Sequence, residues 1–256
     1  MNSFANYVIT QPNKEPELPL VHTTEFYKLP DIRETNELSP TKDEEFKEAV
    51  LYFFYGRPAY RDPKKNTPEP TGDSCPICFV FRPRTISTRI KRIYPFDTGA
   101  SKNGFYEPHL SRSAPLNTYS VPAIIESARR IISGFFDTNE NYLRNKPLKN
   151  LKFGNTEQDV ETYYKLITQD DLNGSDDRVS AIEIQIDCAA DLSAGELMAV
   201  VFPTFLFEDS GFRETLLHVW KAQPLTYDAD RGMRPTEHHG TVRQLIRKFY
   251  EQWRFV

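Results

Sequence analysis

The run from Ala49 to Tyr55, with the sequence AVLYFFY, is the feature that most restricts how this chain can fold. Its consecutive apolar and aromatic residues leave no polar face, so the segment must be covered on both sides. The run is too short for a typical buried helix, and Gly56 and Pro58 follow it and break regular pairing. It therefore predicts a buried strand inside a packed core.

The composition of the whole chain agrees with a packed core. Its 256 residues are 39% hydrophobic and include 18 Phe and 13 Tyr, an aromatic content that excludes global disorder. No stretch reaches the roughly 20 apolar residues that cross a bilayer, and residues 1–20 lack the pattern of a secretory signal. Three cysteines are too few for a disulfide framework. These features predict a soluble, cytoplasmic, globular protein.

Strand and helix patterns are mixed along the chain without a regular βαβ repeat, which favours the α+β class. Residues 1–19 are polar with three prolines and predict an extended arm, and residues 20–256 predict a single domain. Apolar spacing predicts helices over 25–36, 122–136 and 241–253. Further strands are expected over 20–24, 75–81, 90–96, 179–186 and 197–203.

Charge is unevenly distributed. The net charge of −4 argues against a chain that binds polyanions over its whole surface. A basic strip nevertheless runs from Arg82 to Arg92, and the predicted helix from Thr241 is basic and amphipathic. The strip is either a phosphate-binding surface or the solvated face of a strand, and the sequence leaves both open.

The motif Cys75-Pro-Ile-Cys78 is a single C-x-x-C at the start of an apolar strand. A structural zinc site needs four ligands, and no histidine or cysteine stands at a matching spacing. The pair is therefore interpreted as core cysteines, with redox and metal roles left open. The chain has no nucleophile elbow, no P-loop, no zinc-protease motif and no dinucleotide-binding glycine motif.

Three separated segments carry side chains suited to nucleotide chemistry. His22-Thr23 ends a predicted strand, Arg57 follows the aromatic run, and Glu183 interrupts the apolar sequence AIEIQ. Each has a plain structural interpretation as well: a core histidine, a surface arginine and a solvent-facing glutamate.

Taken in this order, the segments resemble the ADP-ribosyltransferase superfamily, and most closely its branch of DarT-type DNA ADP-ribosyltransferase toxins. The resemblance lies in residues 20–60 and 178–203, with Lys28 in place of the family's asparagine and Glu37 in place of its turn glycine. The matching segments are His22–Thr24, Lys28–Ile32, Glu37–Pro40, Leu51–Tyr60, Ala181–Gln185 and Leu197–Pro203.

The resemblance implies a fold, a substrate and a reaction. The fold would be an ADP-ribosyltransferase-like split mixed β-sheet core with flanking helices. The substrate would be NAD, from which ADP-ribose passes to a macromolecular acceptor (DNA, RNA or protein), as in toxin or phage-defence effectors. No metal is implied.

The resemblance also implies roles for particular residues. Glu183 and Arg57 would be catalytic, the carboxylate stabilising a cationic ribose and the guanidinium holding the diphosphate. His22 and Thr23 would hydrogen-bond the cofactor, and aromatic side chains would form flat walls for nicotinamide. The residues expected to bind the cofactor are His22, Thr23, Lys28, Tyr52, Phe54, Tyr55 and Tyr60.

Three other functions stay open at this stage. Water could be the acceptor, which would make the protein a NAD glycohydrolase. A non-catalytic nucleotide- or nucleic-acid-binding module would instead use the basic strip and the C-terminal helix. A structural protein could dock a partner through the helix from Thr241.

Overall fold

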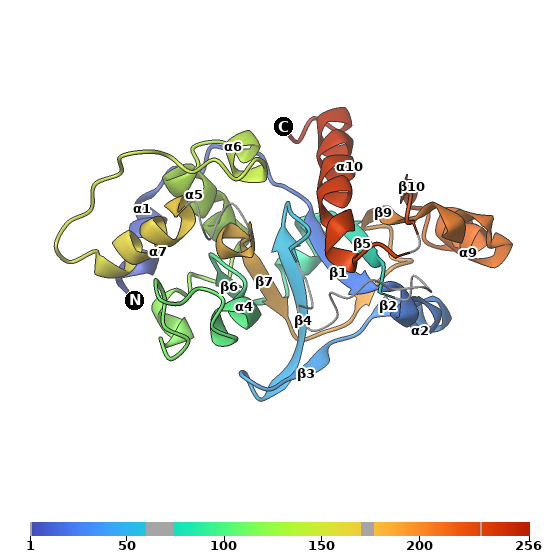
Figure 1. Ribbon diagram of the computed structural model, residues 1–256, viewed down its shortest axis with the longest axis horizontal. Coiled ribbons are helices and arrows are strands. Elements are labelled where there is room, and N and C mark those ends of the chain that lie inside the picture. Colours follow the sequence, from blue (N-terminus) through green and yellow to red (C-terminus); the bar gives the residue numbers. More distant parts are fainter. Residues whose placement is uncertain (1, 60–73, 170–176, 231) are drawn as a thin grey trace. The chain divides into compact units, whose positions relative to one another are not determined.

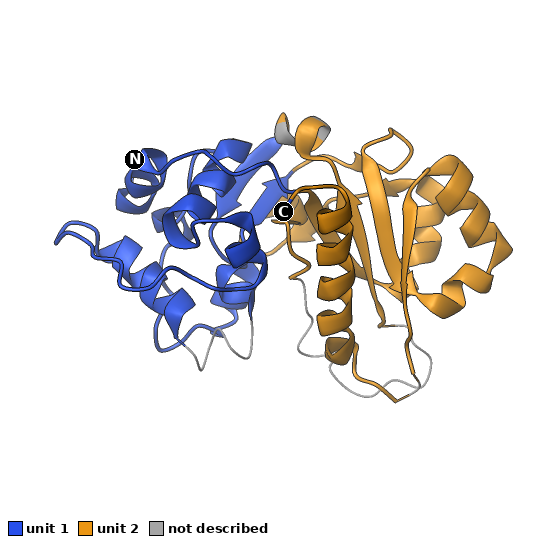
Figure 2. Ribbon diagram, turned by 90° about the horizontal axis from the view of Figure 1, so that it is seen from above, with its two compact units in different colours: residues 1–18, 90–186, 256 blue, residues 19–89, 187–255 orange. Residues whose placement is uncertain are grey.

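The computed structural model describes residues 2–59, 74–169, 177–230 and 232–256. The chain divides into two compact units (Figures 1 and 2). The first comprises residues 1–18 and 90–186 with residue 256, and the second comprises 19–89 and 187–255. Each unit combines strands and helices, which confirms the α+β class.

Helices of the first unit pack around an aromatic cluster. Helix α1 contacts α5 and α7, and the Phe4 ring of α1 lies against the rings of Phe135 and Tyr163. All three side chains are fully buried. The helices of this unit are α1 (Ser3–Thr10), α4 (Thr98–Lys102), α5 (Ile125–Phe135), α6 (Asn139–Leu143) and α7 (Gln158–Thr168), with short 3-10 turns at Leu116–Thr118 and Asp177–Ser180.

Two antiparallel strands complete the first unit. Strand β6 (Ile90–Tyr94) pairs with β7 (Glu183–Ile186), and Tyr94 lies opposite Glu183. The predicted strands at both places are confirmed, although β7 begins four residues after Val179. Residues 177–180 form a 3-10 turn instead.

The second unit contains a mixed sheet in the strand order β10-β9-β5-β1-β4. Strands β10 and β9 run parallel, and the other neighbours are antiparallel. A short strand, β3, pairs with β4, and β2 pairs with β8 in a separate two-stranded ribbon. The strands are β1 (Leu20–Glu25), β2 (Glu37–Leu38), β3 (Thr41–Asp43), β4 (Glu48–Tyr55), β5 (Pro76–Phe81), β8 (Ala190–Asp191), β9 (Leu197–Pro203) and β10 (Gln223–Tyr227).

The apolar runs of the sequence form the centre of this sheet. All residues of β5 and β9 are buried, as a strand covered on both faces requires. The AVLYFFY run lies within β4, as predicted. Strand β1 lies between β4 and β5 and pairs with both of them through its backbone.

Helices of the second unit flank its strands. The C-terminal helix α10 (His239–Gln252) contacts β9 and β10 and buries Val242, Ile246 and Phe249. No helix in the described parts of the chain is long and apolar enough to cross a membrane. The other helical segments are Phe26–Lys28 (3-10), α2 (Leu29–Thr35), α3 (Pro83–Ser87), Thr204–Glu208 (3-10), α9 (Ser210–Glu214), Thr215–Val219 (π) and Pro235–His238 (3-10).

The predicted extended arm is corrected by α1. Its prolines all follow residue 11, so none interrupts the helix Ser3–Thr10. Asn2 caps the helix, because its side-chain oxygen accepts a hydrogen bond from the Ala5 amide at 2.6 Å. Phe4, Ala5 and Val8 are buried, so this segment belongs to the core of the first unit.

The single domain predicted over 20–256 differs from the observed two units. The chain passes between them at residues 18/19, 89/90 and 186/187, and again at its last residue. The crossings at 89/90 and 186/187 lack the proline- or glycine-rich composition that marks a linker in sequence, whereas Pro16 and Pro19 lie at the first crossing. Residues 19–89 and 187–255 are far apart in sequence but build one sheet together.

Candidate functional site

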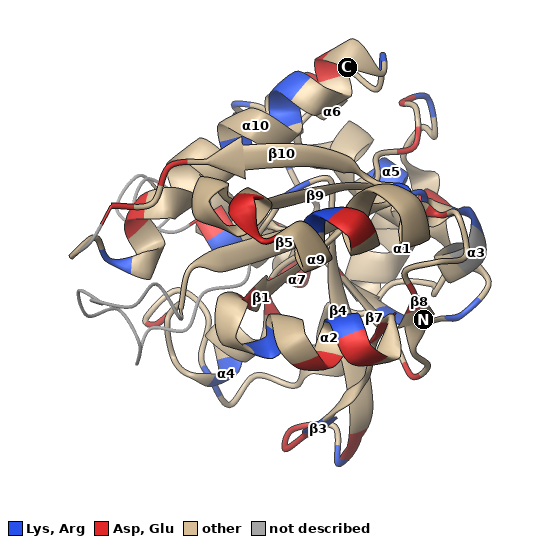
Figure 3. Cartoon of the chain, turned by 90° about the vertical axis from the view of Figure 1, so that its right-hand side faces the viewer, with Lys and Arg blue, Asp and Glu red and all other residues tan. Residues whose placement is uncertain are grey.

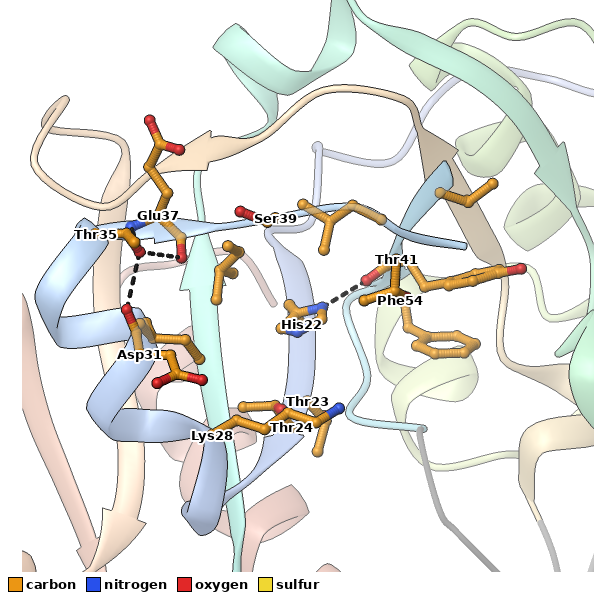
Figure 4. A pocket seen from close by; sticks show the side chains of 15 residues that line it. His22, Thr23, Thr24, Lys28, Asp31, Thr35, Glu37, Ser39, Thr41 and Phe54 are labelled. Carbon is orange, nitrogen blue, oxygen red and sulfur yellow. Dashed lines mark hydrogen bonds between the residues drawn. The ribbon is translucent and has the colours of Figure 1, made fainter. Parts of the chain in front are cut away.

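A pocket of about 420 Å³ opens in the second unit (Figure 4). Its size is in the range of small-molecule sites. Its walls come from β1, the helical segment up to Thr35, the link to β3, and β4. The lining residues are His22, Thr23, Thr24, Lys28, Asp31, Ile32, Thr35, Glu37, Leu38, Ser39, Thr41, Val50, Leu51, Tyr52 and Phe54.

His22 lies on β1, which runs between β5 and β4 in the sheet, and its side chain lines this pocket. Val21 of β1 pairs with Phe54 of β4, which brings His22 beside the neighbouring strand. The His22 Nδ1 atom is 2.8 Å from the backbone carbonyl oxygen of Tyr52. The His22 ring also meets the Phe53 ring edge-on at 5.8 Å. The strand pairing and these two contacts fix the orientation of the imidazole.

The protonation state of His22 follows from its surroundings. Burial lowers its pKa to about 4, and the positive charge of Lys28 adds to this, although the hydrogen bond to Tyr52 acts in the opposite direction. The imidazole is therefore neutral at physiological pH. A carbonyl oxygen can only accept, so Nδ1 carries the proton and donates it to Tyr52. Nε2 is then the ring atom that can accept a hydrogen bond from a ligand.

Helix α2 forms a second wall of the pocket. The preceding 3-10 turn ends at Lys28, and Pro30 lies in the first turn of α2, where its missing amide proton costs nothing. Leu29 and Ile32 bury the helix against the unit. The helix stops at Asn36, which adopts a left-handed conformation (φ 55°) and accepts a hydrogen bond from the Trp220 indole at 2.8 Å.

Strand β4 and its hairpin partner β3 form a third wall. Tyr52 and Phe54, two residues apart, lie on the same face of β4. The Tyr52 hydroxyl donates to the Asp43 carboxylate at 2.6 Å, and Asp43 also accepts from the Glu45 and Phe46 amides. This carboxylate therefore ties the turn of the hairpin to the strand that lines the pocket.

Five of the nine residues predicted as site residues line this one pocket. They are His22, Thr23, Lys28, Tyr52 and Phe54. Asp31, Thr35 and Thr41 line the pocket as well, although they were not predicted as site residues. Asp31 had a usable signal, because it follows Lys28 by three residues on a helix and so lies on the same face.

Arg57 and Tyr55 are not among the described residues that line this pocket. Arg57 follows Gly56, which takes a positive φ of 71°, and its side chain is 1% exposed. The alternative interpretation of Arg57 as a surface residue is therefore wrong, because its side chain is buried. Tyr55 is fully buried, and Tyr60 lies outside the described residues.

Glu183 belongs to the other unit, where it is 1% exposed. Its carboxyl group accepts hydrogen bonds from the Thr98 amide (2.9 Å), the Thr98 hydroxyl (2.8 Å) and the Gln185 amide nitrogen (2.6 Å). Burial raises its pKa to about 8, and the negative charge of Asp97 adds to this, while the three hydrogen bonds oppose the shift. The solvent-facing interpretation of this glutamate is therefore excluded.

The cysteine pair takes part in packing. Cys75 and Cys78 are both buried, and neither forms a disulfide bond. Burial raises the pKa of Cys78 to about 12, which makes it unreactive, and its sulfur lies 3.3 Å from the Thr23 hydroxyl. In the described parts of the chain, no group of three His, Cys, Asp or Glu side chains is placed to hold a metal ion.

The basic strip does not form one surface within a unit. Arg82, Arg84 and Arg89 are exposed in the second unit, whereas Lys91 and Arg92 lie on β6 of the first. Arg92 donates to the Gln185 side chain at 3.0 Å. Figure 3 shows that α2, which lines the pocket, carries both positive and negative side chains.

Comparison with known proteins finds no family model, no curated protein and no solved structure that matches this chain.

Proposed function

We propose that this protein uses NAD to transfer ADP-ribose to a macromolecular acceptor, on an ADP-ribosyltransferase-like split sheet. One observation carries the proposal. Three segments that the resemblance groups together, around His22, Lys28 and Tyr52, line a single pocket. Many folds place unrelated strand and helix segments on different faces, so this convergence supports a shared ligand.

The pocket has the parts needed to hold one nucleoside half of NAD. Ile32, Leu38 and Phe54 are buried and supply an apolar floor for a flat ring. His22 Nε2 accepts a hydrogen bond from a ligand hydroxyl or amine. Lys28 contributes a positive charge for the diphosphate, and Arg57 is proposed to contribute a second one.

The reaction breaks the glycosidic bond between the ribose carbon and the nicotinamide nitrogen. The bonding electrons leave with nicotinamide, and the ribose becomes an oxocarbenium-like cation. The acceptor nucleophile then bonds to this carbon and releases its proton to a base. Glu183 is proposed to stabilise the cation as a carboxylate and to orient the nucleophile. Since burial raises its pKa to about 8, turnover should increase as the pH rises through that value.

Incubation with NAD labelled in its adenosine half tests this function. Label that enters DNA, RNA or protein supports transfer. Free ADP-ribose without transfer indicates a NAD glycohydrolase on the same fold. Tight NAD binding without any product indicates a non-catalytic nucleotide-binding module, and absence of NAD binding refutes the proposal.

Two substitutions at His22 give a sharper measurement. An asparagine amide can reach the position of Nδ1 and keep the bond to Tyr52, but it removes Nε2. A glutamine amide can instead reach the position of Nε2. We expect His22→Asn to weaken NAD binding about tenfold, the cost of one buried ligand hydrogen bond, and His22→Gln to weaken it less. Calorimetric titration measures both, and equal affinity in His22→Asn and the wild type would contradict the role of Nε2.

A further inference from the structure

The charged residues of the pocket are not equivalent. Lys28, Asp31 and Glu37 line it, and each is exposed at its rim. Figure 4 shows Lys28 and Asp31 on the same side of His22, whereas the Glu37 carboxylate points away from the imidazole. Lys28 is also close enough to His22 for its charge to lower the pKa of the imidazole. A ligand on His22 therefore meets one ammonium and one carboxylate.

Among the described residues, no ion pair involves Lys28 or Asp31. The Lys28 ammonium lies 5.7 Å from the centre of the Tyr27 ring. By contrast, Arg33 on the same helix is paired with Asp209 at 3.2 Å. Lys28 and Asp31 are thus available to a ligand.

A pocket lined by both a carboxylate and a neutral imidazole is suited to a ribose. The two adjacent hydroxyls of a ribose are donors, and both the Asp31 oxygens and His22 Nε2 are acceptors. The apolar floor favours an uncharged ring such as adenine over the pyridinium cation, because a buried charge without a partner is costly. A phosphate on the ribose 2′ oxygen would replace a donor by a dianion facing Asp31.

We propose that Asp31 is a specificity-determining residue that accepts a hydrogen bond from the adenosine ribose and excludes 2′-phosphorylated nucleotides. This inference rests on the proposed function, because it assumes that the pocket takes the adenosine half of NAD. Lys28 meets the first phosphate, and Asp31 selects the unphosphorylated ribose. The protein should then discriminate NAD from NADP, and AMP from its 2′-phosphorylated form.

Calorimetric titration of the full chain with these four nucleotides tests the assignment. We expect Asp31→Asn to reduce the ratio of NAD to NADP affinity about tenfold, because the repulsion of the 2′-phosphate is removed while an acceptor oxygen is kept. Glu34→Gln is the matched control. It removes a carboxylate from the same helix at an exposed position that does not line the pocket, and the ratio should stay unchanged.

The outcomes separate this inference from the proposed function. A ratio that falls in Asp31→Asn but not in Glu34→Gln supports the assignment, even if NAD is never turned over. Turnover of NAD with equal affinity for NAD and NADP overturns the role of Asp31 and leaves the transferase proposal intact. Failure of the wild type to bind any of the four nucleotides overturns both.

Discussion

Replacement of Phe4 by alanine is expected to lower the free energy of unfolding of the first unit by about 4 kcal/mol. The Phe4 side chain is 0% exposed and contacts three other rings, those of Tyr119, Phe135 and Tyr163, at centroid distances of 5.6, 5.9 and 5.3 Å. Removal of the ring leaves a cavity between helices α1, α5 and α7. Urea unfolding followed by far-ultraviolet circular dichroism measures the loss.

Ile9→Ala is the control for this prediction. Ile9 lies on the same helix but is 40% exposed, so its truncation should cost less than about 1 kcal/mol. The unfolding of the second unit can be followed separately by tryptophan fluorescence, because both tryptophans, Trp220 and Trp253, belong to that unit. Equal costs for Phe4→Ala and Ile9→Ala would mean that α1 is not part of the core.

Some elements could be predicted because local patterns determine them. The apolar runs in β4, β5 and β9 have no polar face and can only be buried strands. Helix α5 was expected over 122–136 and is observed over Ile125–Phe135, because its apolar residues follow the helical period. The helix expected from Thr241 begins two residues earlier, at His239.

Other elements depend on contacts that the local sequence does not contain. Helix α1 is a short helix that depends on the Asn2 cap and on Phe4 inserting among rings from α5 and α7. The two units are likewise defined by pairings between distant segments, such as β5 with β9. Phe4 and Val8 stand four residues apart, which is a helical spacing, but one such pair in eight residues is too little to predict a stable helix. The pairing of β5 with β9 leaves no local pattern in the sequence.

The candidate site also combines residues that local sequence patterns predict with residues that depend on distant contacts. The helical spacing in Lys28–Ile32 and the strand at His22 were readable, and both line the pocket. The burial of Glu183 was not, although its alternation with Gln185 placed the two side chains on one face of β7. The group that covers this face is Thr98, which lies 85 residues away in sequence. A local pattern shows which residues share a face but not what covers it.

Glu183→Gln is expected to abolish NAD turnover, by about a thousandfold or more, while the fold is retained. Glutamine is nearly isosteric and can still accept a hydrogen bond from the Thr98 amide or hydroxyl. It cannot become a carboxylate, so it cannot stabilise a cationic ribose. The release of nicotinamide from NAD measures turnover, and normal turnover in this variant would remove Glu183 from the chemistry.

The same variant should change how stability depends on pH. The pKa of Glu183 is raised from an ordinary value of 4.5 to about 8 in the folded chain. Between these two values the folded state keeps a proton that the unfolded state releases, so the wild type loses stability as the pH rises through this window, by on the order of 5 kcal/mol. Glutamine does not titrate, and its variant should lack this decline.

Glu161→Gln serves as the control for both measurements. Glu161 is a half-buried residue of α7 in the same unit, paired with Lys165 at 2.7 Å, and a pair of this kind near the surface contributes about 0.5 kcal/mol. Its loss should change neither turnover nor the decline in stability between pH 4.5 and 8. The two measurements on Glu183→Gln are independent. If the variant turns over NAD normally but its stability no longer falls with pH, Glu183 is a buried, protonated residue with a structural role only. If turnover is lost but stability still falls with pH as in the wild type, the carboxyl group is ionised at neutral pH.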